Sequence, residues 1–467
     1  MKSYRQTFHI SPPYGFMNDP NGLSYFKGRY HVFYQWNKKF PHGKEVHWGH
    51  FSSQDLVTWQ HHPSVLAPVD YYDKNGCYSG SAIEYGGKLL AFYTGNVKNT
   101  KGERETYQCL AISEDGDNFI KYGKNPLINN FPSGYTPHFR DPKVWQKDGI
   151  WYMVIGAQRE DLTGTAVLYK GEDPFNWSLV GEISKEKLGY MWECPDLFPL
   201  EDKDILVFCP QGLEPQGDLY NNRYQCGYMV GKLDYKRGKF AGSPFVELDR
   251  GFEFYAPQTF LTPDGRRILW AWMGMPEEGD QPTLAENWIH CLTIPRELYL
   301  KGEKLCQKPI PELENLRFAP HYLPKFTIED TFRFIKEFAG ERVEINLEIA
   351  NIDAQEYGLY FRCDREQSQY TKLKVDGKTS KVTLDRDRSG LWTKGQRTVA
   401  LNSVENLKIR VFIDTSSIEI FLNEGEETFT ARIFPDDKSV NFGIYSIGGK
   451  VEVLKAEKWD LKAGIIF

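Results

Sequence analysis

The sequence contains no apolar stretch approaching the roughly 20 residues that a membrane-spanning helix needs. Its first residues, Met1 to His9, also lack the apolar run of a secretory signal. We therefore expect a cytoplasmic protein with no membrane partner.

Cysteines are sparse, and their spacing indicates neither disulfides nor metal ligands. The chain has 8 Cys in 467 residues, and none of them forms a CxxC pair. A large chain with scattered cysteines is typical of a reducing compartment with free, buried thiols. No zinc-ligand spacing is present, so we expect no bound metal.

The sequence also lacks a basic block or stripe, and its formal net charge is −6. This balance argues against a nucleic-acid partner. No pattern in the sequence indicates an oligomeric state, so a monomer and a dimer are both left open. Aromatic residues make up 15% of the chain, which suits stacking on sugars and β-rich cores equally.

One strand–turn–strand unit recurs five times in the first two thirds of the chain. Its turns are roughly 60 residues apart, a spacing typical of propeller blades. Most of these turns are favourable hairpin sequences. They lie at Lys27-Gly28, Gly86-Gly87, Asp148-Gly149, Asp202-Lys203 and Asp264-Gly265. A weaker marker, an acidic turn leading to an aromatic residue, recurs at 53–59, 113–119 and 171–177.

We therefore predict an all-β protein that begins with a five-bladed β-propeller over residues 1–305. A large sandwich or jelly roll with coincidental periodicity is the competing interpretation, which five regular copies make less favourable. A Pro-bounded linker follows at 306–325. Strands with period-two alternation then predict a C-terminal β-sandwich over 326–467.

Three acidic residues stand at the start of innermost strands, where the strands of a propeller approach the mouth of its central channel. These are Asp19, Asp141 and Glu193, and Ser79 and Tyr255 begin the other two strands. The repeat would bring them around one funnel although they are far apart in sequence. Like charges gathered in this way shift pKa values and favour a division between acid and base. Glu193 also has apolar sequence neighbours, which would help it to keep its proton.

Each motif also has a structural interpretation when taken alone. Asn18-Asp19-Pro-Asn-Gly is a strong turn sequence, and Arg140-Asp141 could be a simple ion pair. Their recurrence at matching places of the repeat favours a functional site.

These motifs resemble those of the invertase and β-fructofuranosidase family, glycoside hydrolase family 32. The three hallmark motifs stand here as Met17-Asn-Asp-Pro-Asn-Gly22, Phe139-Arg-Asp-Pro142 and Trp192-Glu-Cys-Pro195. The resemblance spans nearly the whole chain. The stretch Gly189-Tyr-Met-Trp-Glu-Cys-Pro-Asp-Leu looks most like the intracellular bacterial sucrose-6-phosphate hydrolases.

The resemblance implies a retaining hydrolase that releases a terminal fructofuranosyl unit from sucrose, or from its 6-phosphate, without a cofactor. Asp19 is implied as the nucleophile, Glu193 as the acid and base, and Asp141 as the transition-state stabiliser. A covalent fructosyl-enzyme of this kind needs its two reacting carboxyls about 5–5.5 Å apart.

The resemblance also implies a set of substrate-binding residues. Those expected to bind fructosyl hydroxyls, orient the carboxylates or form apolar walls are Asn18, Gln35, Trp48, Tyr78, Ser79, Arg140, Tyr255 and Trp272. Cys194 is expected to pack behind the site.

Two other enzymatic functions stay open, an exo-hydrolase of inulin or levan and a fructosyltransferase. A non-catalytic sugar-binding propeller is a further alternative, against which the three intact acidic motifs argue. The sandwich could itself bind carbohydrate or mediate dimerisation, although simple packing against the propeller explains it as well.

Overall fold

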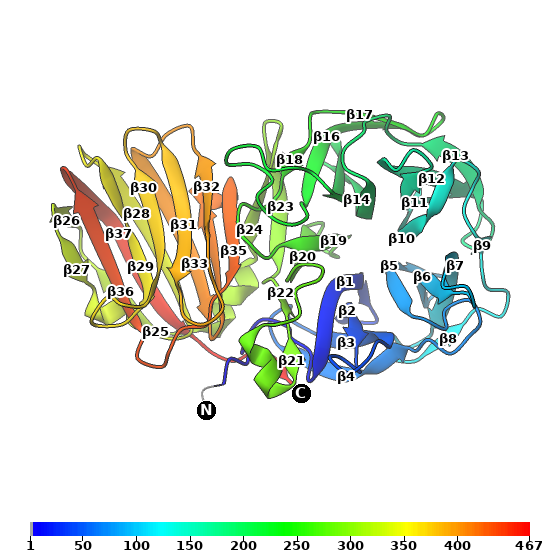
Figure 1. Ribbon diagram of the computed structural model, residues 1–467, viewed down its shortest axis with the longest axis horizontal. Coiled ribbons are helices and arrows are strands. Elements are labelled where there is room, and N and C mark those ends of the chain that lie inside the picture. The colour runs from blue at the N-terminus through cyan, green and yellow to red at the C-terminus, as the bar shows by residue number, and fades with distance from the viewer. Residues whose placement is uncertain (1–2) are drawn as a thin grey trace.

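The computed structural model describes residues 3–467 and consists of a ring of five small sheets beside a two-sheet sandwich (Figure 1). The chain is almost entirely β-strand, joined by a few 3₁₀ helices. The predicted all-β architecture is confirmed. None of the helices in the described part of the chain is long and apolar enough to cross a membrane.

The ring contains five blades, each built from four antiparallel strands in chain order from the hub outwards. Blade I contains β1 (Gly15–Phe26), β2 (Arg29–Asn37), β3 (Val46–Ser53) and β4 (Trp59–Leu66). Blade II contains β5 (Cys77–Tyr85), β6 (Lys88–Lys98), β7 (Arg104–Ser113) and β8 (Phe119–Lys121), with β9 (Ile128–Asn129) beside β7. Blade III contains β10 (Tyr135–Lys147), β11 (Ile150–Arg159), β12 (Gly164–Gly171) and β13 (Ser178–Glu182). Blade IV contains β14 (Met191–Leu200), β15 (Lys203–Gln211), β16 (Gly227–Asp234) and β17 (Lys239–Gly242), with β18 (Val246–Glu247) beside β16. Blade V contains β19 (Tyr255–Leu261), β20 (Arg267–Met273), β23 (Arg296–Lys301) and β24 (Lys304–Pro309), with β22 (Cys291–Leu292) beside β20.

The inner hairpins turn mostly where the sequence predicts. Both residues of the first three turns have positive φ, which is what a two-residue turn between twisted strands requires. The fourth turn was predicted one residue too late, because Leu200 pairs with Lys203 and the turn is Glu201-Asp202. The fifth is a longer connection, since Leu261 pairs with Arg267 across Asp264-Gly265.

The acidic marker has a simple local cause. Asp55, Asp115 and Asp173 each accept hydrogen bonds from two backbone N–H groups two and three residues further on. These Asx turns connect the third and fourth strands of their blades. Asp234 makes the same turn in blade IV, which is not among the three predicted markers.

Every innermost strand carries a β-bulge at the same height. In each, three residue steps on the inner strand face two on its neighbour. The bulged steps run from Met17 to Pro20, Cys77 to Gly80, Arg140 to Lys143, Glu193 to Asp196 and Tyr255 to Gln258. Four of them include a proline, which cannot donate to the ladder and is tolerated at a bulge. A bulge re-aims side chains, so these five positions control what points into the hub.

Two short strands extend the sheet of blade I, and one of them closes the ring. β21 (Trp288–Ile289) pairs in parallel with β1, so the segment between the second and third strands of blade V attaches to blade I. The 3₁₀ helix η1 (Pro282–Glu286) precedes β21. At the other edge of blade I, β38 (Ile465–Ile466) pairs in parallel with β4. The last strand of the chain thus pairs with a propeller blade and not with a sheet of the sandwich.

The sandwich contains two antiparallel sheets. One contains β25 (Arg317–Leu323), β37 (Lys450–Leu461), β28 (Val343–Asn351), β33 (Asn406–Asp414), β34 (Ser417–Leu422) and β35 (Glu427–Arg432), with β26 (Phe326–Glu329) beside β37. The other contains β27 (Phe332–Phe334), β36 (Asn441–Ile447), β29 (Glu356–Cys363), β30 (Tyr370–Asp376), β31 (Lys381–Arg388) and β32 (Gln396–Ala400). The 3₁₀ helices η3 (Lys336–Phe338) and η4 (Asn423–Gly425) complete it. Alternate residues such as Ile345, Leu347 and Ile349 are buried in the core between the sheets.

The segment expected as a linker contains regular structure. Its first residues complete β24, which ends at Pro309, and the 3₁₀ helix η2 (Pro311–Leu316) follows. β25 then pairs with β37 and is already part of the sandwich. The connection between the two domains is therefore short.

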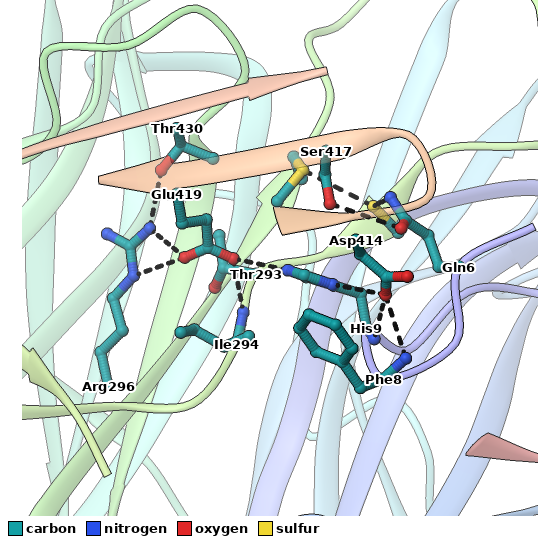
Figure 2. A network of polar contacts seen from close by, with 12 residues as sticks. Gln6, Phe8, His9, Thr293, Ile294, Arg296, Asp414, Ser417, Glu419 and Thr430 are labelled. Carbon is teal, nitrogen blue, oxygen red and sulfur yellow. Dashed lines mark hydrogen bonds and ion pairs between the residues drawn. The ribbon is translucent and has the colours of Figure 1, made fainter. Parts of the chain in front are cut away.

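A buried network of charges joins the two domains (Figure 2). His9, from the N-terminal segment, contacts Asp414 Oδ2 through Nδ1 at 3.0 Å and Glu419 Oε1 through Nε2 at 2.8 Å. Arg296 of β23 donates to the second oxygen of Glu419. All four side chains are fully buried. Burial alone lowers the pKa of His9, but the two carboxylates outweigh it and raise the pKa.

Replacing His9 with an apolar residue should leave two carboxylates buried without this partner. We expect His9→Leu to lower the free energy of unfolding by about 3 kcal/mol, measured by urea denaturation. His321→Leu is a matched control, because His321 lies partly exposed on β25. Equal losses in the two variants would contradict the role of the network.

The stability that His9 contributes should also depend on pH. Because its pKa is raised on folding, the contribution is complete below the ordinary value of 6.5 and is lost as the pH rises through the raised pKa. The His9→Leu variant should lack this loss of stability on the alkaline side. A stability curve with the same alkaline slope in both proteins would count against it.

Candidate active site

The hub of the propeller opens into a pocket of about 360 Å³. Side chains from all five blades or their connections line it. They are Phe16, Asn18, Asp19, Gln35, Lys44, Val46, Tyr78, Arg104, Arg140, Asp141, Glu193, Gln211, Tyr255, Trp272, Pro276 and Glu277. Thus the bulged strands bring Asp19, Asp141 and Glu193 into one pocket.

Asp19 is held mainly through one of its two oxygens. Its Oδ2 accepts hydrogen bonds from Gln35 Nε2 at 3.0 Å and from the Ser79 hydroxyl, and it lies 3.5 Å from the Cys194 thiol. Its Oδ1 receives a bond from Asn18 Nδ2 at 3.2 Å. Burial raises the pKa of Asp19, and the nearby charge of Glu193 raises it further, whereas the bond from Ser79 lowers it.

Asp141 lies on the other side of Cys194. Its Oδ2 accepts the Cys194 backbone N–H at 3.0 Å and lies 3.7 Å from the Cys194 sulfur. The residue has φ of 68°, a strained value for aspartate that its place in the bulge imposes. Burial, opposed by the charge of Arg140, raises the pKa of Asp141 to about 7.

Glu193 faces polar groups in the pocket. Arg140 donates to its Oε1 from Nε at 3.1 Å and from Nη2 at 2.5 Å. Tyr255 Oη, at 2.6 Å, and Gln211 Nε2, at 2.7 Å, donate to its Oε2. The carboxyl group of Glu193 therefore lacks the apolar surroundings that the sequence predicted, because its apolar sequence neighbours are buried in the blades.

Most of the predicted substrate-binding residues line the pocket. These are Asn18, Gln35, Tyr78, Arg140, Tyr255 and Trp272. Ser79 does not line it, because it is fully buried behind Asp19. Trp48 was expected as an apolar wall, but its ring is fully buried between blades I and II and its Nε1 donates to the Tyr78 carbonyl at 2.9 Å.

The equivalence of the five hub positions is looser than the repeat suggests. Asp19 and Ser79 are the second residue within their bulges, Asp141 is the first, and Glu193 and Tyr255 come just before theirs. The bulge makes neighbouring residues converge on the hub, so a shift of one or two positions still reaches the pocket.

Sequence reasoning missed Lys44, Arg104, Gln211 and Glu277 among the lining residues. None of them belongs to an innermost strand. Lys44 lies in the connection between β2 and β3, and Arg104 begins β7. Gln211 ends β15, and its pairing with Met191 two residues before Glu193 could have indicated it.

One group of side chains in residues 3–467 has the spacing of metal ligands, namely His31, His50 and Asp117. None of the three lines the hub pocket. The Asp117 carboxylate also accepts two hydrogen bonds from Arg29, which already supplies its positive partner. This group is therefore not assigned a metal.

Three carboxylates with different partners at the hub of a five-bladed propeller define the site of a glycoside hydrolase. The chain belongs to glycosyl hydrolase family 32. Residues 9–309 match the N-terminal domain of that family, and residues 312–460 match its C-terminal domain. The resemblance read from the motifs is thereby confirmed.

Individual relatives extend this result. A sucrose-6-phosphate hydrolase of Bacillus subtilis (strain 168) is 46% identical over 443 residues, covering 92% of this chain and 89% of the relative. The solved sucrose-6-phosphate hydrolase of Lactobacillus gasseri is 32% identical with a TM-score of 0.90, covering 99% of this chain and 94% of that one. A Bombyx mori β-fructofuranosidase variant, solved with sucrose, is 36% identical with a TM-score of 0.85, covering 99% and 95%.

Removing the Ser79 hydroxyl should change the ionisation of Asp19. Because that bond lowers the pKa of Asp19, we expect Ser79→Ala to move the acid limb of the kcat/KM profile to higher pH. Ser81→Ala is the matched control, since Ser81 lies on the same strand and donates to the Pro142 carbonyl instead. An unmoved acid limb in Ser79→Ala would show that Asp19 ionisation does not limit activity.

Proposed function

We propose that this enzyme hydrolyses sucrose, or its 6-phosphate, by releasing the terminal β-D-fructofuranosyl unit with retention of configuration. The observation that supports this most directly is the convergence of Asp19, Asp141 and Glu193 in one pocket. The sucrose-6-phosphate hydrolases and the β-fructofuranosidase among its relatives support the substrate class.

Asp19 is the proposed nucleophile. Its Oδ2 is occupied by Gln35 and Ser79, which leaves Oδ1, bound only by Asn18, as the oxygen that attacks the anomeric carbon. The bond between this carbon and Oδ1 forms while the bond to the glucosyl oxygen breaks. The same donors on Oδ2 fix the orientation of the carboxylate before the attack.

Glu193 is the proposed acid and base. It gives a proton to the departing glucosyl oxygen, and the resulting carboxylate then takes a proton from water. That water attacks the anomeric carbon and releases Asp19, so the net reaction consumes one water. Tyr255 and Gln211 hold Glu193 at Oε2 and so keep the carboxyl group aimed into the pocket.

Asp141 is proposed to stabilise the transition state. Its backbone is fixed by the bulge and by its N–H bond to Thr94 Oγ1 at 3.0 Å. A carboxyl group held in this way can bind fructosyl hydroxyls more strongly as oxocarbenium charge develops. Asn18 and Arg140 are proposed to bind fructosyl hydroxyls too, while Tyr78 and Trp272 supply aromatic walls.

The proposal includes a cytoplasmic location and a small sugar as the substrate, with no nucleic-acid or membrane partner. All eight cysteines are unpaired and buried, as a reducing compartment allows. A fructosyltransferase and an exo-hydrolase of fructans are the alternatives. A transferase would accumulate trisaccharides at high sucrose, and an exo-hydrolase would prefer inulin to sucrose.

Replacing Asp19 by its amide should remove the nucleophile and preserve the shape of the side chain. We expect Asp19→Asn to lower kcat for sucrose by roughly 1,000-fold or more, measured by glucose release. Asp264→Asn is the control. Asp264 lies in the turn that joins β19 to β20, at the end of this hairpin opposite to Tyr255, and it pairs with Arg266. Near-normal cleavage by Asp19→Asn would rule out the assignment.

An added acceptor shows whether the reaction retains or inverts the configuration of the anomeric carbon. With methanol present, a covalent fructosyl-enzyme should yield methyl β-D-fructofuranoside, identified by NMR. A product of the opposite anomeric configuration would mean direct displacement by water or methanol, with Asp19 in another role.

A further inference from the structure

Two cations lie on one wall of the pocket, beside Tyr78. Lys44 Nζ donates to the Tyr78 hydroxyl at 3.1 Å, and the ammonium lies 5.4 Å from the centre of the ring. The Arg104 guanidinium lies 5.9 Å from the same centre. All three residues line the pocket.

Neither cation has a carboxylate partner within the described part of the chain. No ion pair links Lys44 or Arg104 to an acidic side chain, whereas Arg140 in the same pocket is paired with Glu193. Lys39, five residues before Lys44, is paired with Glu45. Leaving an arginine unpaired in a partly buried wall is unfavourable, and burial lowers the pKa of Arg104. Two cations without carboxylate partners on one pocket wall can attract and bind an anionic ligand.

The position of Lys44 and Arg104 in the pocket indicates which half of the substrate they can contact. The fructosyl unit must lie between Asp19 and Glu193, where its anomeric carbon reacts. Arg104 is close enough to the catalytic groups that the charges of Arg140, Glu193 and Asp141 act on it. Lys44 is exposed, so the two cations run from the reacting groups towards the pocket mouth. A substituent on the departing half of the substrate can reach both.

We propose that Lys44 and Arg104 bind a phosphate ester on the departing glucosyl unit and thereby select a phosphorylated disaccharide. A phosphomonoester carries a charge of about −1.5 to −2 near neutral pH and several strong acceptor oxygens. The guanidinium can bind two of these oxygens and the ammonium supplies a third contact. This inference rests on the proposed function, because it assumes that the pocket cleaves a fructosyl–glucosyl bond.

The test compares two substrates in the same variants. We expect the ratio of kcat/KM for sucrose 6-phosphate to that for sucrose to fall about tenfold in Lys44→Gln and in Arg104→Gln, and about 100-fold in the double variant. Lys39→Gln is the matched control, because it removes a charge from the same connection outside the pocket. Unchanged thermal unfolding of each variant excludes a loss of structure.

A binding experiment gives a second readout that does not depend on turnover. Glucose 6-phosphate should inhibit the wild-type enzyme competitively and more strongly than glucose, and the double variant should lose this difference. Inorganic phosphate alone should inhibit weakly, since the cations bind it without the sugar.

The outcomes separate the two proposals. If the wild type cleaves sucrose but the ratio stays within about twofold in the double variant, the phosphate site is wrong and the proposed function stands. Equal binding of glucose and glucose 6-phosphate to the wild type would likewise overturn the phosphate site. If the wild type cleaves neither substrate, the proposed function itself fails.

Discussion

The hub pocket depends on one irregularity of the backbone, repeated five times. Each innermost strand gains one residue relative to its neighbour at the level of the hub. A regular strand would send alternate side chains into the spaces between the blades. The extra residue turns the chain instead, and in blades III, IV and V it places Asp141, Cys194 and Ala256 at positive φ. The strain at these residues is compensated by the packing of the ring around them.

This arrangement gives three nearby carboxylates different hydrogen-bond partners. Asp19 receives neutral donors, Glu193 receives a guanidinium and a phenol, and Asp141 receives a backbone N–H. The thiol of Cys194 lies between Asp19 and Asp141, where a larger or charged side chain would disturb both. In the proposed mechanism, these different donors separate the tasks of nucleophile, acid and stabiliser among three similar groups.

The architecture could be predicted because its signals are local. Aromatic strands, hairpin turns and Asx turns recur along the chain, and each marks the same element in its blade. The three proposed catalytic carboxylates could be identified for the same reason, as they stand in the repeated bulge or directly before it. The predicted wall residue Trp48 shows the limit, since its strand neighbours do not reveal which face of β3 meets the next blade.

The remaining differences arise from long-range contacts. Lys44 comes from the connection between β2 and β3 and Arg104 from the start of β7, and the packing of blade I against blade II brings them together beside Tyr78. The apolar neighbours of Glu193 suggested a dry carboxyl group, but Arg140 from the adjacent blade reaches it. The β38 strand at the chain end likewise joins blade I, which no pattern in the sandwich sequence indicates.

The central claim is that Asp19 and Glu193 act on one sugar, Asp19 through a covalent bond. Acid quenching of a Glu193→Ala variant with a fructosyl fluoride, followed by peptide mass mapping, tests it most directly. The account predicts one added fructosyl unit on the peptide that contains Asp19. A label on the peptide that contains Asp141, or inverted product without any label, would contradict it.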